Sequence, residues 1–251
     1  MRIPKREVRY GGAMIDQKEI DAVVKVMQNG MSVGENVQTF EKRCAKLLGK
    51  EYGVMVNSGS SALLLAIRLL DLPPGSEIIT PTLTFGTDIS SIAMNGHVPV
   101  LVDVEPDTYQ IDIDKIERNI TPLTKAMLVP SLVGGMPDWD RLRDRHGLKI
   151  IEDSCDTLGG HYRGRPAGER SDISVTSFSI FHIITCLGNG GLVAVNDPQL
   201  WDRALMLRAW GRSSEKFMHG TRQADSDGRF LENLGDIEYD GMFIFEELGF
   251  R

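Results

Sequence analysis

Cysteine is scarce in this chain of 251 residues, which contains only Cys44, Cys155 and Cys186. Three scattered thiols fit neither a disulfide framework nor a zinc site, so a cytoplasmic location is the default expectation. A basic surplus is also lacking, because 28 lysine and arginine residues face 35 aspartate and glutamate residues and the net charge is −7. This balance argues against a general nucleic-acid-binding protein and against a protein that binds anionic membranes.

Long apolar segments are missing as well. No run of about 18 apolar residues occurs, so the sequence predicts no transmembrane helix. The opening MRIPKREVRYGG contains basic side chains with no apolar stretch after them, which is not the pattern of a signal peptide. The chain does have the length of one or two domains and 41% hydrophobic residues, enough for a sizeable core.

Two helices are predicted near the start of the chain. Asp16 followed by Glu19 has the spacing of a capping box, and apolar residues then recur at helical intervals until Asn29. A second apolar face with the same spacing runs from Val37 to Leu47.

The pattern then changes to short apolar runs, which predict strands. These runs are Gly53–Val56, Glu77–Thr80, Val98–Val102, Ala126–Val129, Lys149–Glu152, Ile173–Phe178 and Gly191–Val195. Helical patterns separate most of the runs or follow the last one, at Ser61–Leu70, Asp88–Asn95, Asp112–Asn119, Trp139–Arg145 and Leu200–Trp210. Strands alternating with helices predict an α/β domain with a mostly parallel sheet that is buried on both faces.

Ligands of open α/β sheets bind beyond the carboxyl ends of the strands, so the residues just after each run are the candidates. Asn57-Ser58-Gly59-Ser60-Ser61 opens a helix after the first run, and helix-start N–H groups with hydroxyls can hold a phosphate. The same residues are typical of an ordinary serine helix cap. Asp153 and Asp156 close another run, where a carboxylate could pair with a protonated ring nitrogen, bind a metal, take a proton or cap the next turn.

Three further side chains have two interpretations each. His182 could move protons, although a histidine among apolar residues is more often a core residue; the glycines at 188–191 favour a site. Phe85 could stack on a flat ring or belong to the core. Arg212 could bind a phosphate-bearing substrate or lie solvated at a helix end.

Taken in order, these segments resemble the DegT/StrS-type sugar aminotransferases, pyridoxal-phosphate (PLP) enzymes of fold type I that act on nucleotide-linked keto sugars. The resemblance is carried by Gly30–Gly34, Asn57–Leu63, Pro81–Phe85, Glu152-Asp153, Ser177-Phe178 and Gly188–Gly191, and it extends over about residues 8–212. It implies a three-layer α/β/α large domain with a mostly parallel mixed sheet, and a homodimer.

The resemblance also implies roles for single residues. Gly59, Ser60, Ser61 and Ser177 match residues that hold the cofactor phosphate. Phe85 matches the aromatic residue that stacks on the pyridine ring, and Asp153 the acid that pairs with its nitrogen.

The main departure from the family pattern is His182. Four residues after the Phe of the Ser-Phe pair, the aminotransferases have the lysine that binds PLP covalently, and here that position is His182. No lysine lies between Lys149 and Lys216 to replace it, and an imidazole cannot form an imine with an aldehyde.

Histidine at this position is typical of the nucleotide-sugar 3-dehydratase branch, whose cofactor works as pyridoxamine phosphate (PMP). The resemblance implies that His182 removes a proton from the cofactor and assists loss of the 3-hydroxyl of a 4-keto-6-deoxy sugar. Asp156, three residues after Asp153, is similar to the acid that this branch has at the same position. The resemblance also implies a role in the biosynthesis of deoxysugars and lipopolysaccharide. Two alternatives stay open: an aminotransferase with glutamate as amino donor, and a truncated, non-catalytic remnant that binds the cofactor.

Three segments are expected. Residues 1–50 form an N-terminal helical segment, residues 51–212 the PLP-binding large domain, and residues 213–251 the start of a connection to a small domain that the chain lacks. Family members that take electrons through an iron–sulfur cluster hold it with four cysteines, and the three scattered cysteines here do not provide such a site.

Overall fold

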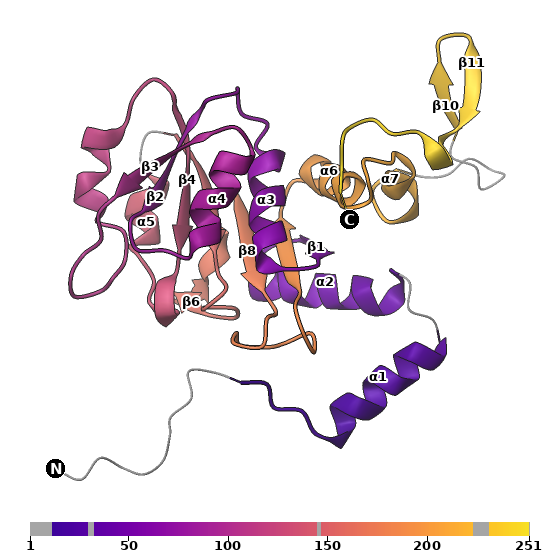
Figure 1. The fold of residues 1–251 in the computed structure, drawn as a ribbon, viewed down its shortest axis with the longest axis horizontal. Helices are drawn as coiled ribbons and strands as arrows, with labels where there is room; N and C mark the ends of the chain where they lie inside the picture. Colours follow the sequence, from indigo (N-terminus) through magenta and orange to yellow (C-terminus); the bar gives the residue numbers. More distant parts are fainter. Residues whose placement is uncertain (1–11, 30–32, 145–146, 223–230, 251) are drawn as a thin grey trace.

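The computed structural model describes residues 12–29, 33–144, 147–222 and 231–250 (Figure 1). At its centre is a seven-stranded sheet of order β1-β9-β8-β5-β4-β2-β3. The strands are β1 Tyr52–Val56, β2 Glu77–Pro81, β3 Val98–Val102, β4 Thr124–Pro130, β5 Lys149–Asp153, β8 Ile173–Ser177 and β9 Gly191–Val195. Each predicted run therefore forms a strand. Only β9 is antiparallel to its neighbours, so the prediction of a mostly parallel sheet is confirmed.

Helices cover both faces of this sheet. The helices are α1 Gln17–Asn29, α2 Glu35–Leu47, α3 Gly59–Leu69, α4 Gly86–Met94, α5 Trp139–Arg143, α6 Pro198–Arg208 and α7 Ser214–Met218. Side chains of α3, α4 and α6 form one core with Ile78 and Ile151, whereas α5 packs on the other face with Ile79 and Ile150. Neighbouring residues of a strand point to opposite faces, which is why these continuous apolar runs are buried on both sides.

The capping box predicted for α1 is present. The Asp16 N–H donates to Glu19 Oε2 at 2.8 Å, and Asp16 Oδ1 accepts from the Lys18 N–H at 2.8 Å. The apolar side of this helix is nevertheless exposed, with Val24 at 45% and Met27 at 60%, and Figure 1 shows α1 apart from the sheet. Gly30–Ser32, which contribute to the family resemblance, and Arg145, predicted to end a helix, lie outside the described residues.

The prediction of one helix over Asp112–Asn119 is wrong. The chain forms two short 3₁₀ turns there, η1 Ile113–Lys115 and η2 Glu117–Asn119. Ile113 and Ile116 are both buried, and their spacing of three residues matches the 3₁₀ period.

The C-terminal part contains elements that its weak periodicity did not predict. Besides α7, it forms the hairpin of β10 Leu231–Leu234 and β11 Ile237–Asp240, followed by η5 Gly241–Phe243. The signal for the hairpin is its two-residue turn, in which Gly235 adopts a φ of +67°. Two further 3₁₀ turns and two short strands lie between β4 and β8: η3 Leu132–Gly134, β6 His161–Tyr162, β7 Arg165–Pro166 and η4 Ala167–Arg170.

Gly191 brings β9 against the turn that precedes α3. A Cβ atom on Gly191 would lie 2.2 Å from the Ser58 carbonyl oxygen, so this approach requires glycine. Since Gly191 pairs with both Val56 and Ser177, it holds the ends of β1 and β8 together at one edge of the sheet. No helix in the described ranges is long and apolar enough to cross a membrane.

Candidate functional site

Apart from Arg212, the residues predicted to form the site lie at or near the carboxyl edge of the sheet. β1 leads through Asn57 and Ser58 into α3, β5 ends at Asp153, and β8 ends at Ser177. These strands run in the same direction, so their ends meet at one edge. The sequence therefore placed these three segments correctly relative to the sheet.

The start of α3 has the features of an anion site. Ser58 Oγ caps the helix by accepting the Ser61 N–H at 3.1 Å, and Ser61 Oγ donates to Asn57 Oδ1 at 2.5 Å. The first N–H groups of a helix have no partner within it, which leaves those of Gly59 and Ser60 available to a ligand.

Gly59 allows this helix start to approach the end of β8. A Cβ atom on Gly59 would lie 2.7 Å from Ser177 Cβ and 3.1 Å from Ser177 Oγ. The Ser177 hydroxyl therefore lies beside the helix N-terminus, and together these groups fit a phosphate.

Asp153 is the buried acid of the site. Its side chain is 7% exposed, and its Oδ1 accepts the Cys155 N–H at 3.0 Å. Burial raises the pKa of this carboxyl, hydrogen bonds from Cys155 lower it, and the charges of Asp156 and His182 act on it in opposite directions. Glu152 points to the other face of the sheet, where Ser174 Oγ donates to its Oε2 at 3.0 Å, so only Asp153 belongs to the site.

His182 lies in the loop that follows β8, next to Asp156. Its Nδ1 lies 3.1 Å from Ser179 Oγ, and its Nε2 lies 4.0 Å from Asp156 Oδ1. The Val133 N–H donates to Asp156 Oδ2 at 2.8 Å and fixes this carboxylate. The side chains of His182 and Asp156 are 23% and 26% exposed, so a ligand can reach both. This exposure excludes the alternative that His182 is a fully buried core residue.

Phe85 is the residue before the first turn of α4, and it is 68% exposed. The alternative of a core aromatic is therefore wrong. A ring that lies open at the carboxyl edge of β2 is available for stacking on a flat ligand.

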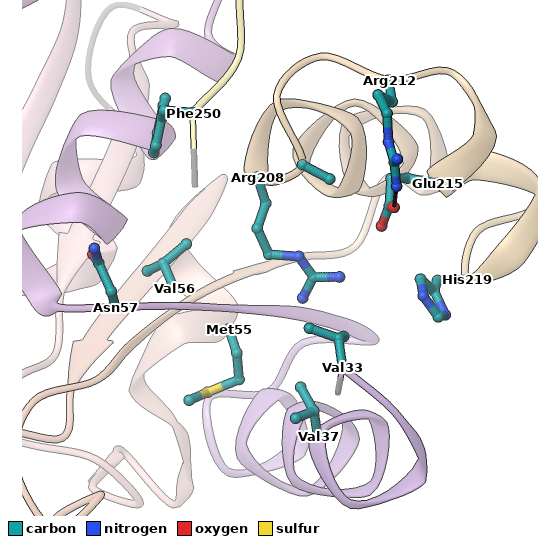
Figure 2. A pocket seen from close by; sticks show the side chains of 11 residues that line it. Val33, Val37, Met55, Val56, Asn57, Arg208, Arg212, Glu215, His219 and Phe250 are labelled. Atoms are coloured by element: carbon teal, nitrogen blue, oxygen red, sulfur yellow. Dashed lines mark hydrogen bonds and ion pairs between the residues drawn. The ribbon is translucent and has the colours of Figure 1, made fainter. Parts of the chain in front are cut away.

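Arg212 lies apart from these residues, in a pocket of about 360 Å³ bounded by α2, β1, α6 and α7. Figure 2 shows it beside Glu215, on the opposite side of this pocket from Asn57. The distance from Arg212 Nη2 to Glu215 Oε1 is 3.2 Å, and the guanidinium stacks on Trp210 at 5.1 Å. Arg212 Nε is buried without a partner within the described part of the chain.

Sequence reasoning assigned no individual role to Asn57, Ser179 or Asp88, three polar residues at or near the candidate site. Asn57 lies inside an identified segment and Ser179 directly follows Ser177-Phe178, but their hydrogen bonds depend on loop conformation. Asp88 was treated only as the start of a helix, although it is the only charged residue of α4 and follows Phe85 by three positions, which was the available signal.

The chemistry of these side chains fits a phosphorylated pyridine cofactor. A helix start with hydroxyls suits the phosphate, a buried carboxylate suits a protonated ring nitrogen, and an exposed phenyl group suits the ring face. An imidazole close to the acid can transfer protons.

Comparisons with known proteins identify the family of this chain. The family model described as the DegT/DnrJ/EryC1/StrS aminotransferase family matches residues 13–230. A dTDP-3-amino-3,4,6-trideoxy-alpha-D-glucose transaminase from Streptomyces venezuelae is 35% identical, over 90% of this chain and 60% of that protein. A dTDP-4-dehydro-2,6-dideoxy-D-glucose 3-dehydratase from Saccharopolyspora spinosa is 34% identical, over 97% of this chain and 55% of that protein.

A solved structure has the same fold. The GDP-4-keto-6-deoxy-D-mannose-3-dehydratase of E. coli with bound hydrated PLP superposes with a TM-score of 0.83 at 26% identity, over 96% of this chain and 62% of that one. This chain spans roughly half to two thirds of the length of these proteins. The sheet order and the superposition show the large-domain architecture of fold type I PLP-dependent transferases. Since the family model covers most of its length, the chain belongs to the DegT/DnrJ/EryC1/StrS aminotransferase family.

Proposed function

We propose that this chain forms the cofactor-binding part of a PLP- or PMP-dependent enzyme that removes the 3-hydroxyl group from a nucleotide-linked 4-keto-6-deoxy sugar. The observation that carries the proposal is His182, which by the resemblance takes the position of the family's cofactor-binding lysine; its Nε2 lies 4.0 Å from Asp156 Oδ1. The similarity to proteins named as 3-dehydratases supports it.

The residues at the carboxyl edge would hold the cofactor. Ser60, Ser61 and Ser177 bind its phosphate together with the N–H groups at the start of α3. Phe85 stacks on the ring, and Asp153 pairs with the ring nitrogen, which the negative charge keeps protonated. When bound, the PMP form supplies an amino group for the keto sugar and a ring that accepts electrons.

His182 would move the proton in this site. Ser179 Oγ lies within hydrogen-bond distance of its Nδ1, so Nε2 is the nitrogen that would accept a proton from a bound cofactor. Asp156 lies on the Nε2 side, where its charge stabilises the imidazolium that results. The same imidazolium then gives its proton to the departing 3-hydroxyl, which leaves as water.

Further parts of the proposal concern partners. Arg212, with its unpaired Nε, is assigned to a phosphate group of the nucleotide-linked substrate. We also propose a homodimer in the cytoplasm, with glutamate as amino donor where the cofactor is to be regenerated.

The second candidate is nucleotide-sugar amination. The Streptomyces venezuelae relative is named as a transaminase and is as similar to this chain as the dehydratases are. In this alternative His182 does not take part in deoxygenation, and an external amine replaces the lysine.

Covalent trapping tests the central observation. The protein is incubated with PLP, reduced with borohydride and analysed by mass spectrometry, beside a His182→Lys variant. The wild-type chain should remain unmodified, and the variant should gain one cofactor mass at residue 182. A reduced adduct on the wild-type chain would show that another amine replaces the lysine, which contradicts the proposal.

A second assay separates the two functions. The protein with PMP is given GDP-linked or dTDP-linked 4-keto-6-deoxy sugars, with and without glutamate, and the products are resolved by mass. Loss of the 3-hydroxyl supports the dehydratase; amination at the keto carbon without such loss supports the aminotransferase.

A further inference from the structure

Asp88 is a buried acid beside the cofactor site that the proposed mechanism does not use. It lies in the first turn of α4, three residues after Phe85, and its side chain is completely buried. Thr84 Oγ1 donates a hydrogen bond to Asp88 Oδ2. Asp88 Oδ1 has no partner among the described residues, which is unusual for a buried carboxyl oxygen.

The topology places Asp88 at the level of Asp153. Ile92 of α4 and Ile151 of β5 belong to the same core, on the face of the sheet that α3 and α4 cover side by side (Figure 1). Asp88 lies one helical turn before Ile92, about 6 Å closer to the carboxyl edge. Asp153 lies two residues beyond Ile151 on the same strand face, about 6.6 Å closer to that edge. Both acids therefore lie toward the carboxyl edge of the sheet, close enough for the charge of Asp153 to act on Asp88.

Burial and the neighbouring charge determine the protonation of Asp88. Burial raises its pKa well above the usual value, and the charge of Asp153 raises it further, whereas the Thr84 hydrogen bond lowers it. In a protonated Asp88 the carboxyl proton belongs on Oδ1, because Oδ2 already accepts the Thr84 hydroxyl proton. The groups that face Asp88 are Thr84 of the preceding loop, Asp153 of β5 and the Cys155 thiol, whose pKa is also raised by both acids.

We propose that Asp88 is a neutral member of the cofactor site, so that Asp88 and Asp153 together present one negative charge to the ring nitrogen. The proposal rests on the proposed function insofar as it names the cofactor. One carboxylate matches one pyridinium charge, whereas a second buried carboxylate would lack a counter-ion. Asp88 acts through Asp153 and is a positioning residue, since in its neutral form it adds no repelling charge beside the Asp153 carboxylate.

Two amide substitutions separate a neutral role from a charged one. Asp88→Asn keeps the size and a donor, while Asp153→Asn removes the charge that pairs with the ring nitrogen. PLP is titrated into each apoprotein and followed by absorbance and fluorescence. Asp88→Asn should bind PLP within about threefold of the wild-type affinity with an unchanged spectrum, and Asp153→Asn should bind about tenfold or more weakly. A loss in Asp88→Asn as large as in Asp153→Asn overturns the proposal, because it shows that Asp88 is charged.

Unfolding of the apoprotein gives a second readout that needs no cofactor. A carboxyl that is protonated in the fold and ionised in the unfolded chain stabilises the fold less as the pH rises from about 4. Asp88→Asn removes this dependence. The stability of the variant relative to the wild-type protein should therefore increase with pH, and the ratio of the two unfolding equilibrium constants should change by up to about tenfold per pH unit. Asp107→Asn, at an exposed residue, is the matched control.

The two readouts distinguish this inference from the proposed function. If the wild-type protein does not bind PLP at all, the proposed function fails, while the unfolding data still test the charge of Asp88. A constant difference between Asp88→Asn and the wild-type protein from pH 5 to 8 shows an ionised Asp88 and overturns the inference.

Discussion

Arg208 Nη1 lies 2.5 Å from Glu41 Oε1, and this ion pair between α6 and α2 is buried, with side chains 10% and 8% exposed. The same carboxylate oxygen accepts the Met55 N–H of β1 at 2.7 Å. Burial raises the pKa of Glu41 although Arg208 lowers it, which shows how much solvation both groups have lost. The pair connects two helices to the strand that leads into the cofactor site.

Breaking this pair should destabilise the fold. Arg208→Met leaves the Glu41 carboxylate buried without its counter-ion, which costs about 3 kcal/mol in the free energy of unfolding. Urea denaturation of the apoprotein measures the loss. Arg141→Met, which removes a guanidinium that is 45% exposed and paired with Asp114, is the control and should cost less than about 1 kcal/mol. Equal effects of the two substitutions would contradict a structural role for the buried pair.

Gly59 should tolerate no side chain. The Cβ atom of Gly59→Ala would lie 2.7 Å from Ser177 Cβ, so the start of α3 must move away from the end of β8. Since both segments are expected to contact the phosphate, we expect PLP affinity to fall by about tenfold or more, while the fold is retained. Gly12→Ala, where nothing lies within 4 Å of the added atom, should leave affinity unchanged. Wild-type affinity in Gly59→Ala would show that the phosphate binds elsewhere.

Ser179 should determine which nitrogen of His182 is free. Its Oγ lies 3.1 Å from Nδ1, closer than Asp156 Oδ1 is to Nε2, so the neutral ring should carry its proton on Nδ1. In Ser179→Ala only Asp156 remains, and the proton should move to Nε2. Nitrogen-15 NMR of the imidazole in the apoprotein reports this change, and Ser179→Thr should restore the wild-type signals. Identical spectra for wild-type protein and Ser179→Ala would exclude this role.

Strand positions were accessible from the sequence because each strand is a short apolar run bounded by polar residues, as in β5 and β9. The candidate residues follow from the rule that ligands bind at carboxyl ends, and that rule correctly brought Asp153, Ser177 and the start of α3 together. The 3₁₀ turns around Ile113 and Ile116 could not be predicted from the sequence, because they depend on the burial of these two isoleucines. The spacing of apolar residues over only eight positions does not distinguish a 3₁₀ helix from an α-helix.

The surroundings of each side chain depend on tertiary packing. The sequence does not show which partners Glu152 and Asp153 contact on the two faces of the sheet, or that Asp88 is completely buried. It likewise gives no reason to place Arg212 in a separate pocket next to Glu215, because that depends on the turn after α6.

Glu152 should make stability depend on pH near neutrality. Burial raises its pKa to about 7, although Ser174 and the buried Lys50 favour the charged form. A carboxyl whose pKa is raised in the fold stabilises the protein fully below the unfolded value, here about 4.5, and this contribution is lost as the pH rises through about 7. Between pH 4.5 and pH 8, the free energy of unfolding of Glu152→Gln should therefore increase by about 3 kcal/mol relative to that of the wild-type protein.

Urea denaturation of both proteins across this pH range measures the difference, and contributions common to both, such as that of Asp88, cancel in the comparison. Glu51→Gln, at an exposed residue just before β1, is the control and should follow the wild-type curve. Lys50 limits the size of the effect, because its Nζ donates to the Ser171 carbonyl at 2.5 Å within the same buried network and its charge favours the ionised glutamate. A parallel pair of curves for Glu152→Gln and wild type would mean that Glu152 is ionised throughout, with Lys50 as its counter-ion.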